Sequence, residues 1–293
     1  MGSWPLICPI CDDGLRHTEG ALVCATGHSF DVAREGYVNL MPSGHRARGI
    51  EGDTAGMLNA RRRFLDAGHY RPLLDALGES VAAALQDLGP AHLGPERRTC
   101  VLEVGCGEGY YLGNIASTYR GGADTHMAFL GADVSKAAAR LAAKRYSEAR
   151  FIVADTNRRI YVNSGSVGVL LDVFAPRNVA EFARVVVPGG CVVMVIPSPS
   201  HLGSIRSTLG LLGIEEDKEA RVLDRFKEGF RLADRRELSY GLELTPESAQ
   251  DLVDMGPNHW HDTGRVAAAG VAGFETEASF VILRLERLQP TEG

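Results

Sequence analysis

The 293-residue chain lacks any hydrophobic run close to the ~18 residues that a membrane-spanning helix requires. It opens with MGSWPLIC, without the cationic and apolar segments of a secretory signal. Positive charge is not in excess either, because 31 Lys and Arg face 37 Asp and Glu, for a formal net charge of −6. We therefore expect a cytoplasmic protein in which any contact with nucleic acid is confined to a local patch.

Cysteine is also scarce, with six residues in the chain, which excludes the dense disulfide framework of a small secreted domain. Hydrophobic residues make up 45% and charged residues 23%, as in an ordinary folded protein. A chain of this length can hold one medium-sized domain and a small appendage. Three of the six cysteines fall within the first 24 residues, and this uneven distribution marks the appendage.

Those three cysteines and one histidine form two short pairs of metal-ligand type. Cys8 and Cys11 are spaced C-x-x-C, and Cys24 and His28 follow with the spacing C-x-x-x-H. Two such pairs joined by a hairpin-length loop are typical of a tetrahedral zinc site, whose four protein ligands leave no open position for a substrate. We predict structural Zn²⁺ here. The alternatives are a redox C-x-x-C motif, ordinary buried cysteines, or His17 as the fourth ligand.

Composition divides the chain into three predicted parts: a zinc-binding recognition module at 1–42, a linker with a basic helix at 43–72, and the main domain at 73–293. Asp53 or Thr54 is placed to cap a helix that runs to about Asp66. Arginines gather in the second part and are candidate phosphate contacts, with a solvated helix turn as the alternative. They are Arg46, Arg48, Arg61, Arg62 and Arg63.

The main domain alternates apolar strands with helices. TCVLEV, AFLGAD, FIVADT, SVGVLLDV and CVVMVIP are the expected strands, with helical sequences after most of them. Strands that are apolar along their length and separated by helices indicate an α/β fold with a doubly wound, mostly parallel sheet. SFVILRLERL predicts a last strand, antiparallel and at the end of the sheet.

A glycine-rich turn follows the first of these strands, in Glu103-Val-Gly105-Cys-Gly107-Glu-Gly109. A dinucleotide-binding fingerprint needs a glycine six positions after the first, where this chain has Tyr110. The alternating glycines instead allow a ligand to approach the backbone, and Glu103 can hold a cationic amine. This combination suits S-adenosylmethionine.

Two further acids strengthen that prediction. Asp133 ends the second strand, where a carboxylate can bind both ribose hydroxyls, and Asp155 ends the third, where it can bind the adenine amine. In open α/β sheets ligands bind at these carboxyl ends of strands. The alternative is that these are ordinary turn acids.

The fourth strand ends in DVFAPRN, which would face the transferred methyl group. Asp172 can bind the edge of a planar nitrogen nucleophile, and Phe174 can stack on its ring. The alternative is a helix cap followed by a core phenylalanine.

Taken together, the chain resembles the 23S rRNA guanine-N1 methyltransferases, and within them the macrolide-resistance (tylosin/mycinamicin) branch. The resemblance rests on CPIC with C-x-x-x-H, HSFDVAREGYVNL, ARRRFLDAGHY, GCGEGYY, DVSKAAARLAAKRY and DVFAPRN, and covers nearly the whole chain. It implies a class I S-adenosylmethionine-dependent methyltransferase with a Rossmann-like, mostly parallel seven-stranded sheet.

The resemblance also implies partners and site residues. The cysteine-rich module would recognise RNA, and the substrate would be a hairpin in domain II of 23S rRNA, held by a homodimer. S-adenosylmethionine contacts would fall on Tyr70, Gly107, Glu108 and His201. Methylation of a guanine-748 type position, with guanine-745 as the alternative, would confer resistance to tylosin-like or mycinamicin-like macrolides.

Chemistry sets one further requirement, because guanine N1 must lose its proton before it can attack a methyl group. Asp172 is the candidate base, and the target base must be unpaired or flipped out. A methyltransferase for small molecules and a non-catalytic zinc-dependent RNA-binding protein are the rival functions.

Overall fold

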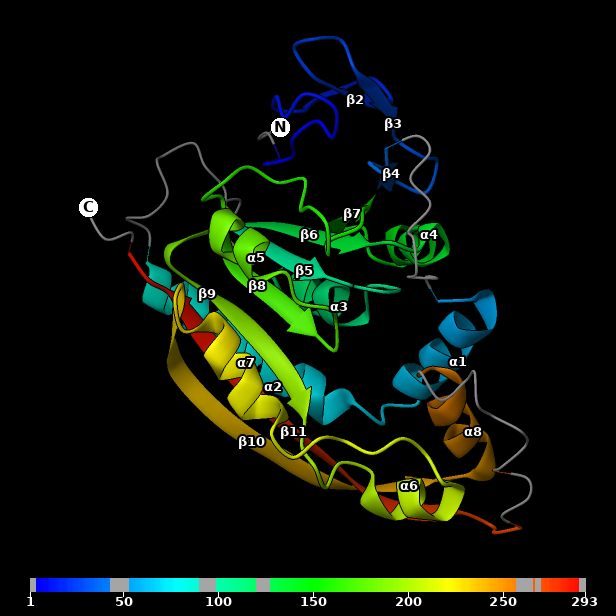
Figure 1. The fold of residues 1–293 in the computed structure, drawn as a ribbon. Coiled ribbons are helices and arrows are strands. Elements are labelled where there is room, and N and C mark those ends of the chain that lie inside the picture. The colour runs from blue at the N-terminus through cyan, green and yellow to red at the C-terminus, as the bar shows by residue number, and fades with distance from the viewer. Residues whose placement is uncertain are drawn as a thin grey trace.

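The fold is built on one large mixed sheet (Figure 1). The computed structural model describes residues 4–42, 53–89, 99–119, 127–256, 266 and 270–289. Within them the sheet has eight strands in the order β10-β11-β9-β8-β5-β6-β7-β4. In chain order these strands are β4 (Val38–Asn39), β5 (Thr99–Val104), β6 (Met127–Asp133), β7 (Ala149–Val153), β8 (Val167–Val173), β9 (Val186–Pro197), β10 (Phe230–Leu244) and β11 (Phe274–Arg287).

The central strands are parallel, as expected from their apolar sequences. β5 pairs in parallel with β6 and β8, and the outer neighbours β7 and β9 continue the pattern. β5 and β8 are buried at every position. This accounts for the near-continuous apolar runs, since both faces of these strands are covered by helices.

Helices cover the two faces of the sheet. They are α1 (Ala55–Asp66), α2 (Arg71–Leu88), α3 (Tyr110–Thr118), α4 (Lys136–Arg145), α5 (Val179–Val185), α6 (Gly203–Leu209), α7 (Lys218–Phe226) and α8 (Pro246–Asp254). Residues of α2, α3 and α4 share one apolar core with the sheet, and residues of α5 and α7 share the other. Of the helices described, none is long and apolar enough to cross a membrane.

The helix boundaries follow the local signals in the sequence. Thr54 caps α1, its hydroxyl accepting a hydrogen bond from the backbone N–H of Met57 (3.2 Å), so the expected cap is confirmed. Helix α5 ends at Val185, because Val186 already begins β9.

The antiparallel end of the sheet differs in one respect from the expectation. β11 is antiparallel to β9, as expected, but it lies one place inside the edge, which β10 occupies. β10 exposes most of its charged side chains, and therefore has no apolar run by which to recognise it. With β4, the seven expected strands become eight.

The first part of the chain forms a second, small sheet of β1 (Arg16–Thr18), β2 (Ala21–Val23) and β3 (Ser29–Asp31). We call residues 6–31 the cysteine module. Strand β4 follows the module in the chain and pairs in parallel with β7. The cysteine module therefore sits on the β7 edge of the main sheet (Figure 1).

Candidate functional site

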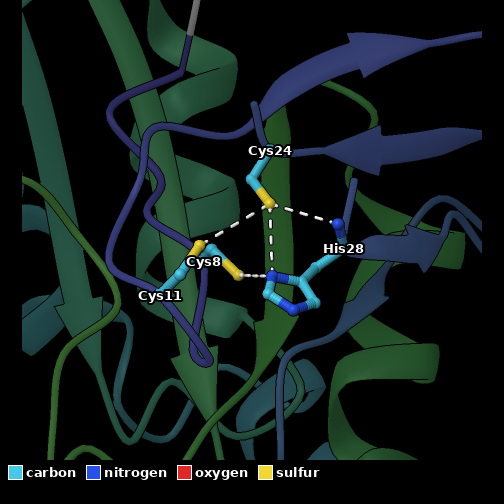
Figure 2. Close-up of side chains that lie close together, drawn as sticks. All are labelled: Cys8, Cys11, Cys24 and His28. Atoms are coloured by element: carbon cyan, nitrogen blue, oxygen red, sulfur yellow. Dashed lines mark hydrogen bonds between the residues drawn. The ribbon is translucent and has the colours of Figure 1, made fainter. Parts of the chain in front are cut away.

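Three cysteines and one histidine of the cysteine module point toward one another (Figure 2). Cys8 Sγ lies 3.6 Å from His28 Nδ1, and Cys24 Sγ lies 3.4 Å from the same nitrogen. Cys11 Sγ lies 3.7 Å from Cys24 Sγ. All four potential ligand atoms lie within 4.8 Å of one another.

The hairpin between the two pairs explains how residues so far apart in the sequence meet. β1 and β2 pair around a turn at Glu19-Gly20, and Gly20 has the positive φ (80°) that such a turn requires. The backbone N–H of His28 also points at Cys24 Sγ, 3.2 Å away. His17 lies exposed on β1 and is not part of the cluster.

The dimensions of the cluster fit zinc. A tetrahedral ion with Zn–S and Zn–N bonds of about 2.3 and 2.0 Å separates its ligand atoms by about 3.5–3.8 Å. The three measured separations of 3.4–3.7 Å have this size. Three sulfurs and one imidazole are also the donor set typical of a structural site.

The glycine turn, residues 105–109, connects β5 to α3 in a backbone conformation that favours glycine. Gly105, Gly107 and Gly109 have φ values of +62°, +54° and +79°. A Cβ on Gly105 would stand 2.6 Å from the Cβ of Ala175, and one on Gly109 would stand 2.9 Å from the Phe151 ring. The glycines therefore serve both backbone conformation and close packing.

Two carboxylates accept hydrogen bonds from the backbone, Asp133 from the glycine turn and Glu103 from the first turn of α3. Asp133 accepts hydrogen bonds from the backbone N–H groups of Gly107 and Ser135, both at 2.8 Å. Glu103 is 1% exposed and accepts one from Leu112 N–H at 3.1 Å. Burial raises the pKa of Glu103 to about 8, which favours its neutral form unless a cation lies beside it.

Asp155 lies at the same carboxyl end of the parallel strands, just beyond the end of β7. One of its oxygens accepts a hydrogen bond from the backbone N–H of Asn157 at 3.1 Å. Glu103, Asp133 and Asp155 thus lie at or just beyond the carboxyl ends of neighbouring parallel strands. Open α/β folds bind their ligands at these strand ends.

Glu108 brings an unsatisfied polar atom to the glycine turn. Its side chain is buried, with Oε2 3.3 Å from Arg62 Nε, whereas Oε1 has no hydrogen-bond partner. Burial raises the pKa of this carboxyl, an effect that the nearby Arg62 opposes. A buried carboxylate oxygen without a partner is costly, and it fits a site that a polar ligand completes.

Tyr70 and His201, far apart in the sequence, meet in an aromatic cluster around Phe280. The Tyr70 hydroxyl lies 3.3 Å from His201 Nε2, and His201 Nδ1 accepts a hydrogen bond from Ser279 N–H at 3.1 Å. Burial and the charge of Arg206 lower the pKa of His201 to about 3, so the ring is neutral. With Nδ1 as acceptor, Nε2 carries the proton and donates a hydrogen bond to the Tyr70 oxygen.

Asp172, at the end of β8, is fully buried. One oxygen accepts from Ala175 N–H at 3.1 Å and the other accepts from Arg177 Nε at 3.2 Å. Burial raises its pKa to about 7, while Arg177 acts in the opposite direction. These bonds fold residues 174–178, the β8 turn, back over the carboxylate.

Phe174 stands out of the β8 turn. It has a positive φ of 60° and is 45% exposed, and its ring centroid lies 5.7 Å from that of Phe280. It is therefore not a core residue, and the cap of α5 is Asn178, whose side chain accepts from Glu181 N–H at 3.3 Å. An exposed aromatic in a strained conformation at the edge of a sheet is typical of a binding site.

The arginines of α1 all pair with acids of the same chain. Arg61 pairs with Asp53, Arg62 with Glu108, and Arg63 with Asp251. Among them Arg63 is the most exposed, at 62% of its side chain. Arg46 and Arg48 lie outside the described residues.

Three residues that contribute to the site carry no clear signal in the sequence. Arg177 binds Asp172, the backbone of Ser279 orients His201, and Ala175 packs on Gly105. Arg177 and Ala175 both stood in DVFAPRN, a segment already singled out, whereas Ser279 did not. The Ala175 and Ser279 contacts join distant parts of the chain.

Strand order, the glycine turn and the acids at the strand ends define the class: this is a class I S-adenosylmethionine-dependent methyltransferase fold carrying a zinc ribbon. Residues 6–47 match the family model described as RlmA, N-terminal. Two relatives with this name are 37% and 35% identical over most of their own length and of this one, so the chain belongs to the 23S rRNA (guanine-N1)-methyltransferase family.

The relatives extend along nearly the full chain. A protein of Micromonospora griseorubida, named as a candidate 23S rRNA (guanine-N1)-methyltransferase, is 37% identical over 97% of both chains. The 23S rRNA (guanine(748)-N1)-methyltransferase of Streptomyces fradiae is 35% identical over 87% of this chain and 86% of its own. A methyltransferase structure from Thiobacillus denitrificans with bound S-adenosyl-L-homocysteine has a TM-score of 0.41 and 16% identity, covering 73% of this chain and 90% of that chain.

Proposed function

We propose that this enzyme transfers a methyl group from S-adenosylmethionine to N1 of a guanine in a domain II hairpin of 23S rRNA. The observation that carries the proposal is the 35% identity to a relative named for guanine 748, over 86% of that relative. The guanine-748 type position is therefore our first choice and guanine 745 the alternative. The proposed consequence is resistance to tylosin-like and mycinamicin-like macrolides.

The residues of the glycine turn fit the cofactor. S-adenosylmethionine, when bound, supplies the electrophilic methyl group. We assign its binding to Gly105, Gly107, the buried unpartnered oxygen of Glu108, and the acids of the neighbouring strands. The complete proposed set is Tyr70, Glu103, Gly105, Gly107, Glu108, Asp133, Asp155 and His201.

Within that set, the acids divide the work by position. Glu103 would face the ammonium group, which would favour its charged form despite burial. Asp133 already holds the glycine turn through Gly107, so it would bind ribose while keeping the turn in place. The Tyr70–His201 pair would form another wall of the cofactor site, and the tyrosine hydroxyl could donate a hydrogen bond to the cofactor.

The acceptor side of the site would be the β8 turn. The exposed ring of Phe174 would stack on the guanine base. Stacking of a base on an aromatic side chain contributes ~1–3 kcal/mol to binding. Asp172 is the proposed proton acceptor for N1, since burial raises its pKa to about 7, in the range useful for a base near neutral pH. Its oxygens are engaged by Ala175 and Arg177, so the turn must open before N1 can reach it.

RNA recognition is assigned to the cysteine module, with Cys8, Cys11, Cys24 and His28 as ligands of a structural zinc ion. Arg46, Arg48 and the arginines at 61–63 are further proposed contacts, among which Arg63 has the most exposed side chain. A homodimer would present two such modules to one hairpin. Local basic patches of this kind can bind RNA on a chain with a net charge of −6.

Primer extension on 23S rRNA tests the proposal, because reverse transcriptase stops at N1-methylguanine. Ribosomal RNA incubated with the protein and S-adenosylmethionine should give one new stop in the domain II hairpin, at the 748-type or the 745-type guanine. The matched control is Asp133→Asn, which should abolish the stop. Methyl transfer from labelled S-adenosylmethionine to a small-molecule extract, with no stop on rRNA, would refute the proposal.

A further inference from the structure

Helix α1 lies against the glycine turn, where Arg62 pairs with the Glu108 side chain and Arg61 lies over the backbone at Gly107. A Cβ added to Gly107 would stand 3.2 Å from the Arg61 Nη1 atom. The same guanidinium donates a hydrogen bond through Nη2 to the carbonyl of Met255 at 2.9 Å, which fixes α1 to the end of α8. A cation is thereby held directly over the backbone of the turn.

The present partner of that cation is a carboxylate of the chain itself. Asp53, immediately before the α1 cap, pairs with Arg61 Nη1, and both side chains are only about a quarter exposed. Both groups also act on Asp133, whose pKa is raised mainly by burial; Asp53 adds to this effect and Arg61 opposes it. Asp53 and Arg61 therefore lie close to the acid proposed to bind ribose.

The ligand expected at this place has one anionic group. In S-adenosylmethionine, the sulfonium and ammonium are cations and the adenosine is neutral, so the methionine carboxylate is the only group that can form an ion pair with a guanidinium. Arginine binds carboxylates through two parallel N–H groups, and such charge-assisted bonds are among the strongest in proteins.

We propose that Arg61 binds the methionine carboxylate of the cofactor rather than RNA, and that Asp53 holds the guanidinium as a stand-in until the cofactor enters. This inference rests on the proposed function, since it assumes that S-adenosylmethionine occupies the site. Cofactor entry then exchanges one carboxylate for another on Arg61. Asp53, left beside a second anion, must move away, so it lowers cofactor affinity.

The neighbouring arginines do not fit this role. Arg62 pairs with Glu108 at 3.3 Å, and Arg63 binds Asp251 of α8, with Nε 3.0 Å from the nearer oxygen. Arg63 lies on the same helix and makes a similar ion pair, but away from the glycine turn. Arg63→Gln is therefore the matched control.

Calorimetry with two ligands isolates the amino-acid portion, in which the carboxylate is the group that a guanidinium attracts. S-adenosylhomocysteine carries the amino-acid portion, whereas 5′-methylthioadenosine keeps the adenosine and sulfur but lacks it. Arg61→Gln should weaken S-adenosylhomocysteine binding about 10- to 100-fold, as for loss of a hydrogen-bonded charge partner, and change 5′-methylthioadenosine binding less than about twofold. Asp53→Asn should strengthen S-adenosylhomocysteine binding ~3- to 10-fold and leave 5′-methylthioadenosine unchanged.

The outcomes separate this inference from the proposed function. If the unaltered protein binds neither ligand, the proposed function fails and this inference fails with it. If it binds both, but Arg61→Gln weakens both equally or neither, only the role of Arg61 is overturned. Should Arg61→Gln fail to fold, Asp53→Asn decides: unchanged or weaker S-adenosylhomocysteine binding contradicts the exchange, as does an Arg63→Gln effect as large as that of Arg61→Gln.

Discussion

Replacing Gly105 by alanine measures how tightly the glycine turn packs on the β8 turn. Gly105 has a φ of +62°, which costs an L-residue about 1–2 kcal/mol. Its new Cβ would stand 2.6 Å from the Ala175 Cβ, and overpacking of this kind costs about 1–3 kcal/mol. We therefore expect Gly105→Ala to lower the free energy of unfolding by ~2–5 kcal/mol.

Gly210 supplies the matched control. It has nearly the same φ, +60°, but an added Cβ would meet nothing within 4 Å. Gly210→Ala should therefore cost only the conformational share, ~1–2 kcal/mol. Urea unfolding followed by circular dichroism gives both values, provided that the dependence on urea keeps the same slope in each variant.

A second substitution tests the steric share directly. Ala175→Gly removes the methyl group that the new Cβ would meet, and the next nearest atom, the Ala175 Cα, would be at an ordinary 3.7 Å. The double variant should recover ~1–3 kcal/mol relative to Gly105→Ala, after correction for Ala175→Gly alone. Equal costs for Gly105→Ala and Gly210→Ala, or no recovery in the double variant, would refute the packing argument.

Three other predictions concern the metal, the buried acid and the stacking ring. Cys24→Ser, or removal of zinc by a chelator, should unfold the cysteine module and abolish hairpin binding in a filter assay, while calorimetry shows S-adenosylhomocysteine binding largely intact; equal loss of both would contradict a purely structural metal. Burial raises the pKa of Glu103 from 4.5 to about 8, so ionising it costs stability progressively as pH rises through that interval, by at most about 5 kcal/mol. Glu103→Gln should flatten this part of the unfolding free-energy curve against pH, and a curve unchanged by the substitution would show that Glu103 is not its source. Phe174→Ala should weaken hairpin binding or turnover by ~5- to 150-fold without changing S-adenosylhomocysteine affinity, whereas Phe174→Tyr should retain function.

Local patterns in the sequence predicted the parts of the site that depend on neighbouring residues. The glycine turn and Asp133 lie one strand apart, and parallel pairing of β5 with β6 brings them together without further information. The cysteine–histidine cluster follows in the same way from two short spacings and a hairpin. These features could be recognised because each is built within one supersecondary unit.

Long-range pairing determined what the sequence could not reveal. The spacing of the consecutive arginines in α1 gave no sign that Arg62 and Arg63 pair with acids 46 and 188 positions away. Strand β10 was missed because it lies at the sheet edge with a charged face. In both cases the deciding partner is a tertiary neighbour, which periodicity and spacing do not encode.

The contacts between the cysteine module and the main sheet affect methyl transfer, although the module lies outside the cofactor site. Leu6 of the module forms an antiparallel bridge with Val162. The chain just after the module, strand β4, pairs with β7, whose end leads to Asp155. Buried residues of the module, among them Leu22, also share one apolar core with the strands β5, β6 and β8. The bridge, the neighbouring strand pairing and the common core together fix the orientation of the module relative to the glycine turn. An RNA bound by it would therefore be presented to the methyl donor at a set distance and angle, and such positioning is the main contribution that a protein makes when the cofactor supplies the reactive group.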